Sequence, residues 1–315
     1  MIASRWTLAA SAVFLVGALA GLAVLSEFNL RLAILAMITS ISVIGLYFAF
    51  GLAGLIHLSQ AAFVGIGAYS SALITQGIAV TPWLALIAAS GLTALAATLL
   101  AFPMHRTKSH YLALVTVGFN VSFEVVIRNW TDVTGGYDGL AAIPLIAIRS
   151  GVRSEIEFFY ICLAFVIAAA FTAALIRKSH LGRAMIAVRD DELAAAASGI
   201  DVTRMKTLAF VLCSGYGGLS GALYAHYAGF ISPDDFSLAR SIMLLSMLIV
   251  GGEFSILGAI TGSFFLTYLP EWLRGIGGGY MAAFGILMLG VLIVMPKGIV
   301  GSLESCLRLA KRAKA

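Results

Sequence analysis

Long apolar runs separated by short polar segments dominate the chain. Each run is close to the roughly 20 residues that a helix needs to cross the ~30 Å hydrocarbon core of a bilayer. Lipid offers no hydrogen-bond partners, so only helices or closed barrels span it, and runs of this length favour helices. The pattern predicts an all-α polytopic membrane protein with about ten transmembrane helices, at residues 7–25, 31–50, 61–78, 82–102, 111–128, 156–176, 207–229, 238–252, 254–270 and 280–296.

The first run leaves an alternative open. Arg5 precedes it, and Ala18, Leu19 and Ala20 resemble a signal-peptidase site. The apolar run is long for a signal peptide, so we expect a retained helix. Its removal would leave nine spans and would not disturb the rest of the prediction.

Residues 177–206 form the one long hydrophilic stretch, and they predict a short surface helix. An acidic start suits the positive end of a helix dipole, alanines propagate the helix, and a glycine can end it in the left-handed conformation. These residues are Asp190, Asp191, Glu192, Ala194 to Ala197 and Gly199. So short a helix is marginal in water, so we expect a partner protein to bind it.

Charge places the same stretch on the cytoplasmic side, because Lys and Arg resist translocation. Both chain termini then lie inside, together with most of the 20 Lys and Arg residues. The basic tail, residues 302–315, is expected to rest on anionic headgroups. The chain is thus predicted to be one membrane domain, residues 1–315.

Composition agrees with a membrane protein and excludes several other classes. Apolar residues make up 61% of the chain, charged residues 11%, and mean hydropathy is +1.01. The net charge of +5 reflects the cytoplasmic face, so we expect no nucleic-acid partner. Cys162, Cys213 and Cys306 are scattered and predict neither a disulfide nor a metal site.

Motifs for chemistry within this chain are missing from the sequence. It contains no zinc-ligand spacing, no hydrolase triad and no GxxxxGK[ST] phosphate loop. We therefore expect no catalytic residue, no metal and no cofactor bound by this chain. Any ATP-driven activity requires separate ATPase subunits that hold ATP and Mg.

Residues 51–60 predict a break between two apolar runs. Glycines are followed there by His57, Ser59 and Gln60. Unpaired polar groups cost several kcal/mol each in lipid, so they should cluster where helices break. One interpretation is that this segment lines a translocation path or its inner gate. The other is a cytoplasmic turn satisfied by water.

A polar stripe follows one face of the span at 111–128, with Thr116, Asn120, Glu124 and Arg128 at spacing four. Such a face points toward protein or water rather than lipid, and we expect it to face a subunit interface where the substrate passes. Glu124 and Arg128 can also form an ion pair in the helix, and a structural role is favoured for that pair.

Two glycine-containing segments carry weaker predictions. Thr134, Gly135 and Gly136 begin an external loop that could contact a binding protein or close an outer gate, or could simply be a tight turn. Cys213, Gly217 and Gly221 form a small-residue face at spacing four, which predicts close packing of helices.

Five stretches together resemble ABC importer permeases for branched-chain amino acids, in particular their M-type (LivM-like) subunit. They are GRAMIAVRDDELAAAASGI at 182–200 with Lys206 and AFV at 209–211, GLIHLSQAAFVGIGAY at 54–69, YLALVTVGF at 111–119 with NWTD, TGG and GL between 129 and 140, GG at 251–252 with LG at 257–258 and Gly262, and PKGIVG at 296–301. Their order and spacing carry the resemblance over most of residues 40–301.

The resemblance implies a ten-helix, type II-like ABC permease fold. It also implies four partners: an H-type permease, two ABC ATPases and a periplasmic substrate-binding protein. In such importers the loop between spans six and seven docks on an ATPase, which here implicates Arg189 with Asp190, Asp191, Glu192, Ala194, Ala195 and Gly199.

Two departures from the family pattern leave the identity of the substrate undetermined. His57, Ser59 and Gln60 stand where the family often has Ser, Gly and His, and the acidic residue that commonly follows Gly-Phe is Val121 here. Similar systems carry branched-chain amino acids, urea, short amides or aromatic acids. A stand-alone secondary transporter that uses His57 or Glu124 for protons is the rival reading, and a passive channel is a third.

Overall fold

A computed structural model describes residues 26–77, 80–104, 109–146 and 155–273, together with positions 285–286, 290, 293 and 298–302. The predicted span at 7–25 lies outside the described residues, as do most of the span at 280–296 and nearly all of the basic tail. The predictions made for those three segments are therefore not compared with the structure.

Regular structure in the described ranges is helical, apart from one isolated antiparallel bridge between Leu140 and Ile231. The elements are α2 (Glu27–Leu46), the π-helical turn η1 (Tyr47–Leu52), α3 (Gln60–Gly77), α4 (Pro82–Met104), α5 (Ser109–Asn129), α6 (Thr131–Thr134), η2 (Gly136–Asp138), α7 (Glu155–Lys178), α8 (His180–Asp190), α9 (Glu192–Ala197), α10 (Val202–Ala228), η3 (Pro233–Phe236), α11 (Leu238–Gly251) and α12 (Ile256–Leu273). The predicted spans from 31–50 to 254–270 each coincide with one of these helices, with offsets of a few residues at the ends.

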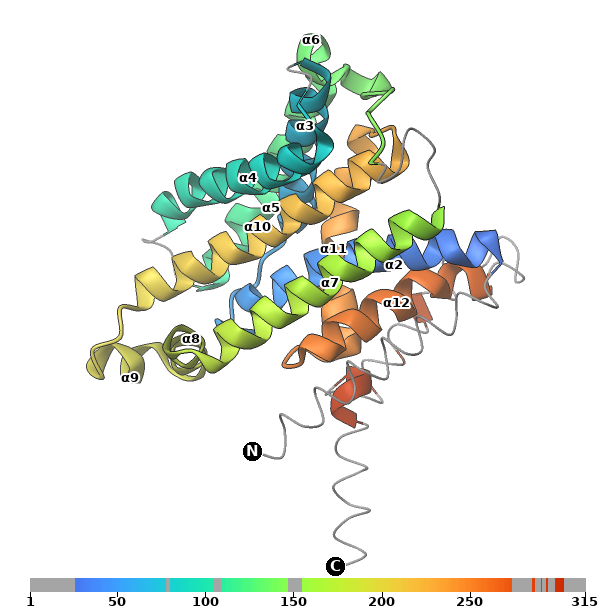
Figure 1. Cartoon of the computed structure of the whole chain (residues 1–315). Helices are drawn as coiled ribbons and strands as arrows, with labels where there is room; N and C mark the ends of the chain where they lie inside the picture. The colour runs from blue at the N-terminus through green and yellow to red at the C-terminus, as the bar shows by residue number, and fades with distance from the viewer. Residues whose placement is uncertain are drawn as a thin grey trace, which may run out of the picture.

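The long helix α10 is the centre of the arrangement (Figure 1). It packs against α3 and α4 on one side and against α2 on the other, and α2 in turn packs against α7 and α12. The short helices α8 and α9 lie at the opposite end of the molecule from α6 (Figure 1). Segments predicted on opposite sides of the membrane are thus at opposite ends of the fold.

Glycines on α10 allow its backbone to touch that of α3. A methyl group on Gly221 would overlap the backbone oxygen of Val64, and Gly218 lies directly against Gly67. Cys213 and Gly217 lie on the same face and are also buried. The prediction that this small-residue face serves close helix packing is confirmed.

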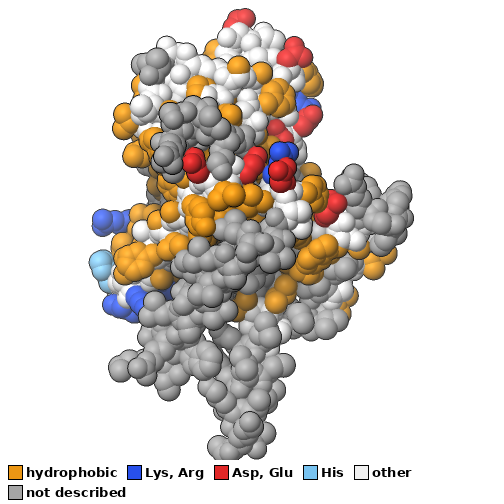
Figure 2. Space-filling model, turned by 45° about the vertical axis from the view of Figure 1, so that its right-hand side comes forward, with side chains coloured by type: hydrophobic (Ala, Val, Ile, Leu, Met, Phe, Trp, Pro, Cys, Tyr) orange, Lys and Arg blue, Asp and Glu red, His pale blue; other side chains and the backbone are white. Residues whose placement is uncertain are grey.

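Five helices in the described ranges are long and apolar enough to cross a membrane: Glu27–Leu52 (α2 with η1), Pro82–Ala101 in α4, Leu112–Asn129 in α5, α7 and α10. Large apolar side chains such as Leu84, Ile87 and Leu99 point outward from α4. Figure 2 shows hydrophobic side chains across the middle of one face, acidic side chains in its upper half and a group of Lys, Arg and His side chains at its lower left edge. The chain is therefore a multi-pass helical membrane protein.

Replacing Gly221 with Ala should destabilise the subunit, because the added methyl group meets the backbone of Val64, which has no flexible end to move aside. Overpacking of this kind costs about 1–3 kcal/mol, so we expect a lower Tm for the protein purified in detergent. Gly91→Ala in α4 is the matched control, since nothing lies within 4 Å of the added methyl group. Equal Tm values for the two variants would contradict this account of the packing.

Candidate functional site

The helical run of α2 ends in a break that is stabilised from neighbouring helices. After η1 the chain is non-helical from residue 53 to residue 59, with Gly54 at φ +66°, and α3 begins at Gln60. The first N–H groups of a helix have no partner within the helix itself. Inside a membrane protein they must find partners in the protein, so the start of α3 is a site where polar side chains are required.

Side chains from α5 and α11 supply those partners. Thr116 accepts a hydrogen bond from the Leu58 N–H (3.2 Å), and Asn120 Oδ1 accepts one from the Ala62 N–H (3.1 Å). Ser241 Oγ accepts from the Ala61 N–H at 2.8 Å and donates to Asn120 Oδ1 at 2.9 Å. We call Thr116, Asn120 and Ser241 the capping cluster.

His57 and Gln60 complete the polar interior of the break. His57 Nδ1 accepts from the Ser59 N–H at 3.2 Å, and its ring lies 4.9 Å from that of Phe210. Gln60 Nε2 donates to Ser42 Oγ at 3.0 Å, to the Ser42 carbonyl and to the Cys213 carbonyl, so that it joins α2, α3 and α10. His57, Ser59 and Gln60 are all fully buried.

Two expectations are corrected by this geometry. The break is not a turn satisfied by water, because His57, Ser59 and Gln60 are buried, and Gln60 and the Nδ1 atom of His57 are hydrogen-bonded to protein. The stripe on α5 does not turn its inner half toward another subunit: Thr116 and Asn120 face α3 and α11 of the same chain, because the free N–H groups of α3 need them there. The sequence could not show which neighbour used these side chains.

At the outer end of the stripe, Glu124 and Arg128 form the predicted ion pair, with 2.6 Å between Oε1 and NH2. Arg128 also meets Asp234 at 2.7 Å and lies 5.5 Å from the centre of the Tyr137 ring. These contacts link α5 to η2 and η3, so the pair joins the end of α5 to two of the loops of the described chain.

The loop after α6 is firmly fixed. Thr134 is buried and donates to the carbonyl of Ile127 at 2.6 Å, while Gly135 and Gly136 both have positive φ. Neither the threonine nor the glycines present a side chain to solvent. Tyr137, in contrast, is 73% exposed in this loop.

The predicted coupling segment contains two helices instead of one. Asp190 ends α8 and does not begin the short helix, which corrects its predicted position. Asp191 is the N-cap of α9 and accepts from the N–H groups of Leu193 (2.8 Å) and Ala194 (3.0 Å). Gly199 has φ +81°, and bonds from the Gly199 and Ile200 N–H groups close the helix as predicted.

Exposure divides α9 into two faces. Leu193 is 83% exposed, and Ala194, Ala196 and Ala197 are exposed beside it. Ala195 is only 4% exposed and packs into the core of the chain, so the expectation that it contacts an ATPase is corrected. We call Leu193, Ala194, Ala196 and Ala197 the α9 surface.

Arg189 points inward and joins α8 to two helix ends. Its NH1 donates to the Gly51 carbonyl of η1 at 2.7 Å, and its guanidinium lies 4.7 Å from the centre of the Phe254 ring in the turn between α11 and α12. Its other nitrogens bond Asp190. Gly54 has no side chain, which leaves room for the Arg189 stem. Lys206 also pairs with Glu192 at 2.6 Å, holding α9 to α10.

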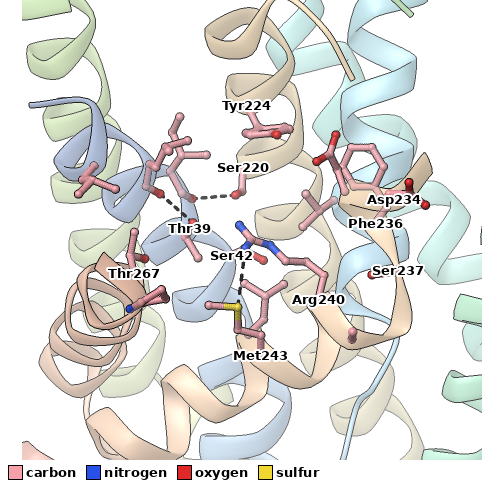
Figure 3. A pocket seen from close by; sticks show the side chains of 18 residues that line it. Thr39, Ser42, Ser220, Tyr224, Asp234, Phe236, Ser237, Arg240, Met243 and Thr267 are labelled. Carbon is pink, nitrogen blue, oxygen red and sulfur yellow. Dashed lines mark hydrogen bonds between the residues drawn. The ribbon is translucent and has the colours of Figure 1, made fainter. Parts of the chain in front are cut away.

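A cavity of about 540 Å³ is the feature that sequence reasoning missed (Figure 3). It lies between α2, α3, α10, η3, α11 and α12, and none of the six predicted path residues lines it. Ser42 connects the two regions, because it lines the cavity and also accepts the hydrogen bond from Gln60. The available sequence signal was weak: Thr39 and Ser42 in one apolar run, and Arg240 near the start of another.

Replacing Asn120 with Ala should destabilise the subunit, because the buried Ala62 N–H and Phe236 carbonyl lose a partner. A buried polar group without a partner costs about 1–3 kcal/mol. Asn129→Ala is the control, since Asn129 is exposed on the same helix and bonds only the carbonyl of Val125. Thermal unfolding in detergent should separate the two variants; a Tm for Asn120→Ala as high as that of the control would refute the role of the capping cluster.

The chain is similar in sequence to a known family of membrane transport proteins. The model of the family described as branched-chain amino acid transport system, permease component, matches residues 28–296. The LivM permease of Salmonella typhimurium strain LT2 is 30% identical over 298 residues, covering 87% of this chain and 70% of that protein. LivM of Escherichia coli K12 is 30% identical over 312 residues, covering 91% and 73%.

The LivH permease of Escherichia coli K12 is 27% identical over 291 residues, which cover 83% of this chain and 90% of that protein. No solved structure matches the chain. The family match includes the break, the capping cluster, the coupling segment and the cavity. The chain therefore belongs to the family of permease components of branched-chain amino acid transport systems.

Proposed function

We propose that this chain is the M-type permease subunit of an ATP-driven importer of branched-chain amino acids. The observation that carries the proposal is the position of α8 and α9: the α9 surface is exposed at one end of the molecule, while Arg189 beside it reaches the ends of α2 and α11. A partner that moves α9 therefore acts on helices of the membrane domain. The relatives named LivM and LivH support this function over a stand-alone secondary transporter.

The partners in this proposal are an H-type permease, two ABC ATPase subunits and a periplasmic substrate-binding protein. ATP and Mg are bound by the ATPases, and this chain supplies no cofactor site. Similarity to both LivM and LivH supports a pair of related permeases around one path. Substrate capture falls to the binding protein, for which the exposed Tyr137 of η2, in the loop after α6, offers a contact.

We place the subunit in the bacterial inner membrane with ten spans, a type II-like fold and both termini in the cytoplasm. Residues 177–206 then lie inside, and closure of the ATPases on ATP shifts the spans between inward-open and outward-open states. The distribution of charge over Figure 2 supports this orientation.

Leu193→Asp should weaken the docking of the ATPases, because it places a charge on the apolar α9 surface. Leu193 is 83% exposed, so the subunit itself should still fold and insert. We expect at least a tenfold loss of ATPase co-purification and of uptake. Leu145→Asp, the same change at another exposed leucine, is the control and should retain the ATPases. Full ATPase retention by Leu193→Asp would argue against the docking surface.

Arg189→Lys should uncouple transport without releasing the ATPases. A lysine keeps the charge but lacks the planar fork that bonds the Gly51 carbonyl and Asp190 while covering the Phe254 ring. Uptake should fall about tenfold while ATP hydrolysis continues. Arg183→Lys in the same helix is the control, since Arg183 is exposed and bonds only the Lys178 carbonyl. Tight coupling in both variants would show that Arg189 does not transmit the movement.

A further inference from the structure

We infer that the cavity between α2, α10 and α11 is a transient binding site for the zwitterionic substrate, with Arg240 receiving its carboxylate. The inference rests on the proposed function and adds a substrate site within the membrane domain. Figure 3 shows the Arg240 side chain extending from α11 into the cavity, toward the side chains of α2 and α10.

Arg240 carries a charge for which the described residues offer no carboxylate in ion-pair range. Its hydrogen bond within the described part of the chain is a long one, 3.8 Å from NH1 to the sulfur of Met243. A charged group in a membrane span without a directly bonded carboxylate is expensive, and such groups mark substrate or ion pathways. A planar guanidinium binds a carboxylate through two parallel hydrogen bonds, which is the geometry that an amino acid provides.

An acidic group lies on another wall of the same cavity. Asp235 of η3 interacts electrostatically with Arg240 without forming an ion pair among the described residues, and its side chain also interacts with the Tyr224 hydroxyl. Its Oδ2 accepts hydrogen bonds from the N–H and the hydroxyl of Ser232. A cation and an anion that share a cavity without pairing suit a ligand with both charges.

Hydroxyl groups at the base of the cavity differ in what they can still offer. Thr39 and Ser220 donate their protons to the carbonyls of Leu35 and Ile38, each at 2.7 Å, so their oxygens are left as acceptors. Ser42 accepts from Gln60, and its own proton has no acceptor among the described residues. Both a donor and acceptors therefore face the ligand.

The remaining wall is apolar and suits an aliphatic side chain. Leu32, Leu35 and Met243 contribute to it from α2 and α11. A volume of about 540 Å³ falls within the roughly 300–1,000 Å³ typical of small-molecule sites. Charged groups at one side and aliphatic groups at the other favour an apolar amino acid over urea or an amide, which lack a carboxylate.

The test uses two assays. One is uptake of leucine and valine into vesicles by the whole complex with its binding protein, and the other is binding of radiolabelled leucine to the detergent-purified complex of permeases and ATPases without the binding protein. Arg240→Gln should lower both leucine uptake and direct binding about tenfold to a hundredfold, because one charge-assisted contact is lost. Arg31→Gln is the matched control, since Arg31 is exposed on α2 outside the cavity, and it should behave as wild type.

The second variant is Leu35→Phe, which narrows the cavity at its apolar wall. It tests the substrate site independently, in case the Arg240→Gln subunit fails to assemble. The ratio of leucine to valine uptake should fall several-fold, a change that cannot arise in the unaltered binding protein. Leu84→Phe on the outer face of α4 is its control. Wild-type binding in Arg240→Gln, or an unchanged ratio in Leu35→Phe, overturns the site. Lack of leucine uptake by the wild-type complex would instead overturn the proposed function.

Discussion

The start of α3 presents backbone N–H groups inside a membrane protein, and their need for hydrogen-bond partners governs the surrounding structure. Thr116 and Asn120 on α5 and Ser241 on α11 meet that need. Because those side chains must reach the same few N–H groups, the positions of α5 and α11 relative to α3 are fixed by hydrogen bonds as well as by packing. Lipid provides no alternative partners, so the arrangement has little freedom.

The helix α2 connects the two regions that we assign to transport. One end of its helical run, at Gly51, accepts the hydrogen bond of Arg189 from the coupling segment. Further along, Leu35, Thr39 and Ser42 line the cavity that holds Arg240. In the proposed function, a displacement of α8 would reach the cavity wall through this one continuous helical element. The coupling segment and the cavity are therefore connected by direct contacts through α2, and the connection is not inferred merely from their separation.

The sequence was informative where physics acts locally. Run lengths predicted the long helices of the described chain, and an acidic start with a terminal glycine predicted α9, because capping depends on residues within a few positions. The sequence did not show which side chains of a helix pack against the rest of the protein. Nothing in four consecutive alanines shows that Ala195 faces the core while its neighbours face solvent.

The polar residues gave the same lesson. The spacing of Thr116 and Asn120 showed that they share a helix face, but the neighbour that needed them is distant in the chain. Arg240 near the start of a span resembles an ordinary interfacial anchor, and only the cavity around it distinguishes it. Side chains whose roles depend on several helices at once remain outside the reach of pattern and propensity.

The π-helical turn at Tyr47–Leu52 sets the directions in which side chains at the two ends of the α2–η1 helical run point around the helix axis. Such a turn holds more residues than an α-helical one, and each residue of an α-helix advances the direction of its side chain by roughly 100°. Deleting one residue here would rotate Gly51 away from Arg189 or Ser42 away from the cavity. The extra residue in the π-helical turn thus lets one continuous helix contact both Arg189 and the cavity, which lie in different directions around the helix axis.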